Sequence, residues 1–231
     1  MMPELNKIYQ GDCLEIMRTW PDKCVDLVIT DPPYGEKTHN GARTGKFNDP
    51  VKNDPVKLVD FNSVDSEYMI SLAKKLCELA KRWVVMTCDW RHCAAIEAAL
   101  PEIFIRAGVW TKPNPTPQFT GDRPSTGWEA VAILHRQGRK QWNGGGHAAV
   151  WHIPKISGEH PTEKPIALLL KWVRLFANED DIILDPFCGS GTTLVAAEKN
   201  RHPWIGIEIE PKYVAIAQAR VDAEMAQGKL F

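Results

Sequence analysis

Short apolar runs alternate with longer amphipathic segments along most of this chain, and that alternation constrains the fold more than any other feature. Brief runs rich in Val, Ile and Trp are typical of strands, and apolar residues at three- and four-residue spacing are typical of helices. The pattern predicts an α/β fold with a mainly parallel sheet covered by helices. We expect strands at 6–10, 25–30, 83–88, 103–110, 129–135, 181–185 and 204–209, and helices at 66–82, 91–99, 165–177, 192–200 and 211–227.

The length of 231 residues predicts a single domain over 1–231 with loop insertions, because it is long for one domain and short for two. Residues 35–65 are polar and too long for an ordinary connection, so they form either a functional loop or a disordered one. Residues 136–158 contain four Lys or Arg, two Trp and two His, without any Asp or Glu.

Composition excludes several classes of protein. The net charge of -1 means that a polyanionic partner would need a local basic surface. The six cysteines include no C-x-x-C pair, and neither they nor the histidines have metal-ligand spacing, so we expect no metal site and a reduced, cytoplasmic setting. No export signal and no apolar run of membrane-spanning length is present, so we expect no membrane association.

The stretch VDLVITDPPYG, residues 25–35, places an acid, two prolines and a tyrosine directly after a predicted strand. Ligands of open α/β sheets bind at the carboxyl ends of the strands, where Asp31 would lie. The prolines remove two backbone donors and stiffen the turn, which leaves an array of acceptors suited to a primary or exocyclic amine. Tyr34, an aromatic residue beside this array, suits a ligand that contains a flat ring. A rigid turn with Tyr34 capping the core is an equally simple interpretation of this motif alone.

A second motif, DIILDPFCGSGTT at residues 181–193, reads as strand, glycine turn and helix. Such a turn lets the backbone approach a ligand closely. The spacing is neither G-x-G-x-x-G nor that of a phosphate loop, which disfavours dinucleotides and ATP. The following strand, WIGIEI, ends near Glu208, as expected of an acid that accepts hydrogen bonds from ribose hydroxyls. Together these features indicate a nucleoside-binding site.

Four motifs in this order resemble the amino-methylating DNA methyltransferases that use S-adenosylmethionine, and the catalytic motif preceding the cofactor motif resembles their β group. The motifs are D-P-P-Y (31–34), H-P-T-E-K-P (160–165), D-P-F-C-G-S-G-T-T (185–193) and G-I-E-I (206–209). The resemblance covers about residues 5 to 220. It implies a Rossmann-like domain with a seven-stranded, mainly parallel sheet of circularly permuted motif order, in which strands 25–30 and 181–185 lie side by side.

The resemblance also implies the site residues. Asp31 and the Pro32 carbonyl would accept the hydrogens of the target amine, and Tyr34 would stack on a flipped-out base. The catalytic residues so implied are Asp31, Pro32, Pro33 and Tyr34. The cofactor residues are Asp12, Thr162, Lys164, Asp185, Phe187, Gly189, Ser190, Gly191, Thr192 and Glu208.

Two of these residues have simpler interpretations, and a nearby cysteine is not given a catalytic role. Asp12 also suits a turn or a helix cap, and Lys164 by itself would be a solvated charge. Cys188 is interpreted as a packing residue, because the cysteine nucleophile of carbon-5 cytosine methylation normally follows a proline and here follows Phe187.

Double-stranded DNA is the partner that the resemblance implies. We expect recognition segments at about 111–128 and 136–158, with contacts from Arg136, Arg139, Lys140 and Trp142. A solvated surface loop is the alternative for the second segment. Because both segments are short, either a compact recognition module or a homodimer would complete the recognition surface.

The expected reaction is methylation of the 6-amino group of adenine, because Asp stands at position 31 where relatives acting on the 4-amino group of cytosine more often carry Ser. Cytosine remains the alternative within the class. Outside it, the chain could be an inactive nucleic-acid-binding module, although all four motifs are intact. RNA or protein methyltransferases with related turns usually carry Asn at this position.

Overall fold

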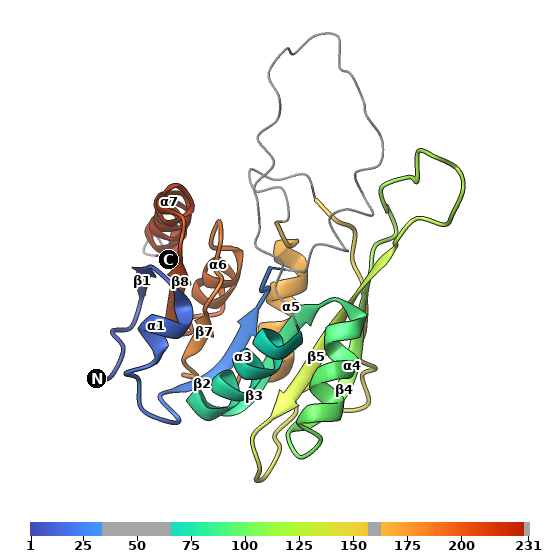
Figure 1. Ribbon diagram of the computed structural model, residues 1–231. Coiled ribbons are helices and arrows are strands. Elements are labelled where there is room, and N and C mark those ends of the chain that lie inside the picture. Colours follow the sequence, from blue (N-terminus) through green and yellow to red (C-terminus); the bar gives the residue numbers. More distant parts are fainter. Residues whose placement is uncertain (34–65, 157–162, 229–231) are drawn as a thin grey trace.

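Eight strands form one sheet in the order β1-β8-β7-β2-β3-β5-β4-β6, as seen in a computed structural model that describes residues 1–33, 66–156 and 163–228 (Figure 1). The first five strands of this order are mutually parallel, whereas β5 runs antiparallel to β3 and β4. The strands are β1 (Lys7–Gln10), β2 (Val25–Thr30), β3 (Ala80–Cys88), β4 (Phe104–Thr111), β5 (Trp128–His135), β6 (Val150–His152), β7 (Ile183–Asp185) and β8 (Trp204–Glu208).

The α/β class and the mainly parallel sheet are confirmed, but the expected number of seven strands is wrong. The additional strand is β6, which pairs with the outer side of β4. Only Trp151 of its three residues is buried, so the segment lacks the longer apolar run by which a strand is recognised.

Strands β2 and β7 are neighbours, as the family resemblance implied for two segments about 155 residues apart. Leu27 pairs with Ile183 and Val28 with Leu184. The side chains of β2 alternate between the two faces, so Val28 joins one hydrophobic cluster and Leu27 and Ile29 join the other. Burial on both faces explains why VDLVIT is almost continuously apolar.

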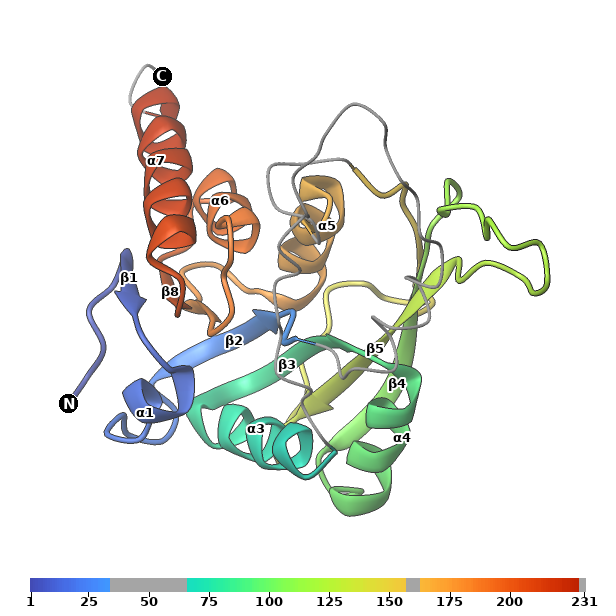
Figure 2. The same ribbon diagram turned by 45° about the horizontal axis from the view of Figure 1, so that its top comes forward.

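Helices cover both faces of the sheet (Figure 2). Helices α1 (Cys13–Met17), α3 (Ser66–Leu79) and α4 (Trp90–Ala99) contribute to the cluster with Val28. Helices α5 (Ile166–Phe176), α6 (Thr192–Lys199) and α7 (Pro211–Gly228) pack on the opposite face. The five predicted helices are present with ends shifted by at most three residues, and the five-residue α1 is an addition.

Within the described residues, none of the helices has the length and apolar character needed to cross a bilayer. The same part of the chain contains no cluster of three or more His, Cys, Asp or Glu side chains arranged to hold a metal ion.

Candidate active site

Four carboxylates line one edge of the sheet. Strands β1, β8, β7 and β2 are adjacent and parallel, so their carboxyl ends meet at the same edge. Each strand ends in an acid or is followed by one within two residues: Asp12, Glu208, Asp185 and Asp31. The sequence-predicted catalytic and cofactor acids are therefore brought together at the edge where α/β proteins bind ligands.

Asp31 is held from two sides. The Thr87 hydroxyl on β3 donates to Oδ1 of Asp31, and the Lys164 ammonium donates to Oδ2 at 2.5 Å. Its side chain is 25% exposed, so the carboxylate is fixed without being sealed from a ligand. Pro32 is buried and Pro33 is half-buried, whereas Tyr34 lies outside the described residues.

The glycine turn between β7 and α6 is built for close approach. Gly189 and Gly191 have φ angles of 49° and 83°, in the left-handed region that disfavours other residues. A Cβ atom on Gly191 would lie 2.8 Å from the Cβ of Ala217 on α7. The Gly191 N–H donates to the Cys188 carbonyl at 2.7 Å, which closes the turn directly before α6 begins.

Glu208 is tied to that turn. Its Oε2 accepts from the Gly189 N–H and its Oε1 accepts from the Glu210 N–H, both at 2.8 Å. These bonds orient a half-buried carboxylate whose remaining lone pairs can accept from a diol. A glycine cradle beside an acceptor-only acid fits a nucleoside cofactor that carries ribose hydroxyls and a positive charge.

Asp185 joins the two motifs from inside the fold. Its Oδ1 accepts from the Thr30 hydroxyl at 2.9 Å and from the Phe187 N–H at 3.1 Å. Burial raises the pKa of Asp185 to about 6, despite these stabilising hydrogen bonds. The carboxylate therefore fixes the start of the glycine turn against β2.

Replacing Asp185 with asparagine is expected to change how the free energy of unfolding depends on pH. Because the folded-state pKa lies above that of an unfolded Asp, the wild type loses stability as pH rises from about 4 to 6. The amide introduced by Asp185→Asn does not ionise, and its oxygen can keep both hydrogen bonds. The free energy of unfolding of the variant, relative to that of the wild type, should rise by about 3 kcal/mol between about pH 3.5 and pH 7. Urea unfolding of both proteins across this range measures it; parallel curves would contradict the expectation.

A network that the sequence did not reveal surrounds the glycine turn. Arg220 on α7 donates to the Ser190 carbonyl at 2.9 Å and hydroxyl at 2.8 Å, and lies 2.8 Å from Oε1 of Glu163. The Thr192 hydroxyl donates to the same Glu163 oxygen at 3.2 Å. Glu163 thus ties the H-P-T-E-K-P segment to the cofactor turn. Nothing in the local sequence marks Arg220 for this role.

Lys164, which follows Glu163, points toward Asp31 of the D-P-P-Y motif. Its Nζ lies 2.5 Å from Asp31 Oδ2 and 3.2 Å from Glu129 Oε2, and its side chain is 10% exposed. The alternative of a solvated charge is therefore wrong. Its expected contact with the methionine carboxylate stays a prediction, and Thr162 of the same motif lies outside the described residues.

Two further sequence interpretations concern Asp12 and Cys188. Asp12 is the N-cap of α1, where Oδ1 accepts from the Glu15 N–H at 3.0 Å, so the helix-cap interpretation is confirmed and its contact with the cofactor stays a prediction. Cys188 is 5% exposed, and burial raises the pKa of its thiol well above the usual range. A thiol in that state is a packing group rather than a nucleophile.

The residues expected to contact DNA lie at the opposite edge of the sheet. Because β5 runs antiparallel to β3, the chain leaves β5 at the amino end of β3, where the Arg136 N–H donates to the Arg82 carbonyl at 3.2 Å. Trp142 packs on Phe176 with ring centroids 5.0 Å apart. The structure does not bring Arg136, Arg139, Lys140 and Trp142 to the edge that holds Asp31.

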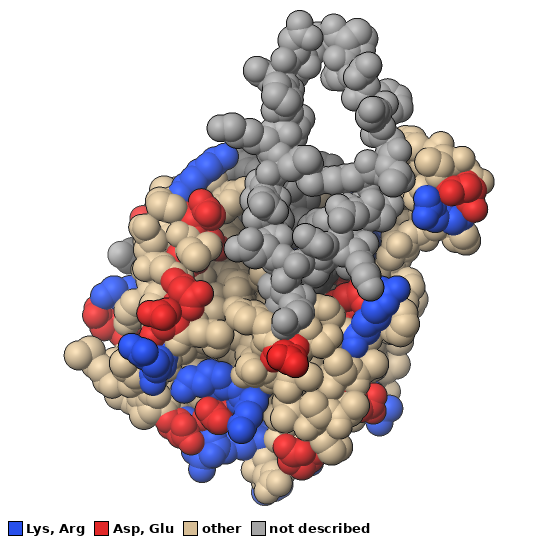
Figure 3. Space-filling view, viewed as in Figure 1, with Lys and Arg blue, Asp and Glu red and all other residues tan. Residues whose placement is uncertain are grey.

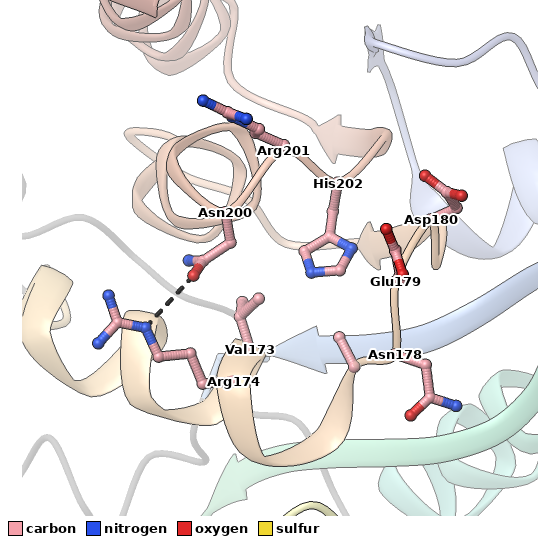
Figure 4. A pocket seen from close by; sticks show the side chains of 9 residues that line it. Val173, Arg174, Asn178, Glu179, Asp180, Asn200, Arg201 and His202 are labelled. Carbon is pink, nitrogen blue, oxygen red and sulfur yellow. Dashed lines mark hydrogen bonds between the residues drawn. The ribbon is translucent and has the colours of Figure 1, made fainter.

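A hollow of about 340 Å³ also lies at that opposite edge (Figure 4). It is bordered by the end of α5 and by the turns before β7 and β8, and Arg174 Nε donates to Asn200 Oδ1 at 3.3 Å across its rim. Its lining mixes both charges and includes none of the predicted site residues.

The motifs and their geometry agree with comparison to known proteins. A family model described as "DNA methylase", of the N6/N4 methyltransferase type, matches residues 25–219. This chain belongs to that family. The expected amino-methylating DNA methyltransferase is thereby confirmed, while membership of the β group stays a prediction.

Several relatives support the assignment. The methyltransferase is 29% identical to the Type II methyltransferase M.HinfI of Haemophilus influenzae, covering 94% of this chain and 68% of the relative. It is 28% identical to the Type II methyltransferase M2.MboI of Moraxella bovis, with coverage of 92% and 86%. The crystal structure of the M1.HpyAVI–SAM complex matches at 26% identity and a TM-score of 0.64, with coverage of 93% and 98%. The SAM of that complex is S-adenosylmethionine, the cofactor that the resemblance implies for this chain.

Proposed function

We propose that this DNA methyltransferase transfers a methyl group from S-adenosylmethionine to the 6-amino group of an adenine flipped out of duplex DNA. One observation carries the proposal: Asp31 and the glycine turn at 187–192 follow adjacent parallel strands, β2 and β7. An amine held by Asp31 is then beside a cofactor held by the turn. Proximity and orientation of this kind are a large part of enzymatic rate enhancement.

The chain's own groups supply orientation and charge. When bound, S-adenosylmethionine supplies an electrophilic methyl group on a sulfonium. Asp31 and the Pro32 carbonyl accept the two amine hydrogens, which directs the nitrogen lone pair out of the base plane. As the amine nitrogen bonded the methyl carbon, the methyl–sulfur bond would break and its electron pair would return to sulfur, leaving neutral S-adenosylhomocysteine. The amine proton would then become acidic and leave through the Asp31 carboxylate to solvent. Glu208 would hold the ribose, and the glycine turn would hold the methionine part.

Methylation of the 4-amino group of cytosine is the second candidate within the class. The fold does not distinguish the two, since a cytosine-N4-specific methyltransferase, PvuII, matches with a TM-score of 0.70 at 17% identity. Asp at position 31 favours adenine. Single-molecule sequencing of DNA from cells that express the protein gives base and context together. Adenine modified in one sequence context is expected; modified cytosine alone would overturn the choice of base.

The hairpin loop between β4 and β5, residues 112–127, is better placed to contact DNA near Asp31 than the segment at 136–142. It projects from the sheet edge that holds Asp31 (Figure 1), and its face in Figure 3 shows adjacent basic and acidic patches among uncharged residues. Asn114 and the Lys155 backbone exchange hydrogen bonds of 3.0 and 2.8 Å, which brace the loop against the chain after β6. Phe119 on the loop is 77% exposed.

Replacing Phe119 with alanine is expected to weaken duplex DNA binding about tenfold, as the loss of one stacking or wedge contact does. Cofactor affinity should not change, because the loop lies away from the glycine turn. Fluorescence anisotropy with labelled duplex measures the first quantity and calorimetry the second. Arg139→Ala is the matched comparison at the opposite edge. A larger loss there than at Phe119 would restore the segment at 136–142 as the DNA surface.

A homodimer that shares recognition, and a cytoplasmic setting, stay predictions. Light scattering with and without duplex DNA tests the first, with one chain per duplex indicating that the hairpin of a monomer suffices.

A further inference from the structure

Four charged side chains of alternating sign lead from the root of the β4–β5 hairpin to Asp31. Lys112 bonds Oε1 of Glu129, and Glu129 Oε2 lies 3.2 Å from Lys164 Nζ. Lys164 Nζ in turn lies 2.5 Å from Asp31 Oδ2. Their side chains are 17%, 16%, 10% and 25% exposed, so the chain of charges is partly shielded from solvent. Charges in such surroundings interact more strongly than on an open surface.

Lys164 sits at the centre of this arrangement as a charged group. Burial by itself would lower the pKa of its ammonium, but the Asp31 and Glu129 carboxylates outweigh that effect and leave the pKa raised. The Trp110 ring adds a third favourable neighbour, with its centroid 5.7 Å from Nζ. Lys164 therefore stays protonated between two anions.

The two oxygens of Asp31 are restrained from different elements. Thr87 on β3 donates to Oδ1, and Lys164, before α5, donates to Oδ2. The plane of the carboxylate is fixed by both donors together. Glu129, at the start of β5, pairs with Lys164 and so restrains the ammonium that bonds Asp31.

We propose that Glu129 is a positioning residue for methyl transfer, which shares the Lys164 ammonium with Asp31 and so holds Asp31 in place while leaving it a strong acceptor for the target amine. The inference rests on the proposed function of Asp31. If Lys164 paired with Asp31 alone, the full ammonium charge would fall on the catalytic carboxylate and weaken its bond to the substrate. Among the described residues, Lys112 pairs with Glu129 and the Asp185 charge acts on Asp31, and neither takes the place of Glu129 beside Lys164.

The test is the single-turnover rate of methyl transfer at saturating cofactor and duplex DNA. Glu129→Gln is expected to lower this rate about tenfold, since small errors in orientation cost one to two orders of magnitude. Dissociation constants for S-adenosylmethionine and duplex should stay within twofold of wild type. Glu129→Asp, which keeps the charge, should recover most of the rate. An unchanged rate in Glu129→Gln, or no recovery in Glu129→Asp, would overturn the inference.

Asp26→Asn is the matched control. Asp26 lies near the start of β2, the strand that Asp31 follows. It pairs with Lys81 at 2.9 Å and its side chain is 14% exposed, close to Glu129 at 16%. It should leave the transfer rate unchanged, and an equal loss in both variants would overturn the inference. If Glu129→Gln does not fold, the transfer rate of Lys164→Gln is compared with that of the double variant Lys164→Gln, Glu129→Gln. Equal rates are expected, because Glu129 acts through Lys164; a slower double variant contradicts this.

Failure of the proposed function and failure of the positioning role give different results. If the wild type does not methylate duplex DNA, the proposed function is wrong and the inference falls with it. If the wild type is active and Glu129→Gln equals it, only the positioning role is wrong.

Discussion

Replacing Asp31 with alanine is expected to lower the rate of methyl transfer about 10³-fold, as loss of a principal electrostatic contact in an active site does. The target amine would lose its carboxylate acceptor. The fold should tolerate the change, because Glu129 lies 3.2 Å from Lys164 and keeps that buried ammonium paired. Cofactor affinity should stay within a few-fold of wild type.

Single-turnover kinetics and cofactor calorimetry on the same preparation separate these effects. Asp31→Asn is the informative companion, since it keeps the shape and one acceptor oxygen but removes the charge. It should be intermediate in rate. A variant Asp31→Ala that retains a tenth of the wild-type rate would show that Asp31 does not hold the amine.

Replacing Glu208 with alanine is expected to weaken binding of S-adenosylmethionine about 100-fold, because two hydrogen bonds to a charged acceptor contribute about 1.5 kcal/mol each. The change also removes the acceptor for the Gly189 and Glu210 N–H groups, which loosens the cofactor turn. The transfer rate at saturating cofactor should fall far less than in Asp31→Ala.

Calorimetric titration of the cofactor measures this loss. Glu210→Ala is the control, since Glu210 is an exposed acid two residues away whose own N–H, rather than its side chain, bonds Glu208. Equal affinities for Glu208→Ala and Glu210→Ala would contradict the assignment of Glu208 to the ribose.

Much of the fold could be predicted because its central strands are apolar on both faces. VDLVIT and the strand ending at Asp185 were placed side by side by the resemblance, and Leu27 does pair with Ile183. The glycine turn was also evident, since Gly189 and Gly191 adopt the left-handed conformations that few other residues reach.

The errors have physical reasons of two kinds. Strand direction is not encoded in apolar periodicity, so the sequence did not show that β5 runs antiparallel and delivers Arg136 to the edge opposite Asp31. Ion pairs depend on tertiary register, which explains why Glu129 and Arg220 were missed although both contact the H-P-T-E-K-P segment. The adjacent charges Glu163 and Lys164 within that segment were the available indication that it forms ion pairs.

The central claim is that an amine held at Asp31 receives a methyl group from a cofactor held at the adjacent glycine turn. The direct measurement is mass spectrometry of nucleosides from duplex DNA incubated with purified protein and methyl-labelled S-adenosylmethionine. Label is expected in 6-methyl-2′-deoxyadenosine with the wild type and almost none with Asp31→Ala. Label on a ring carbon, or equal label with both proteins, would contradict it.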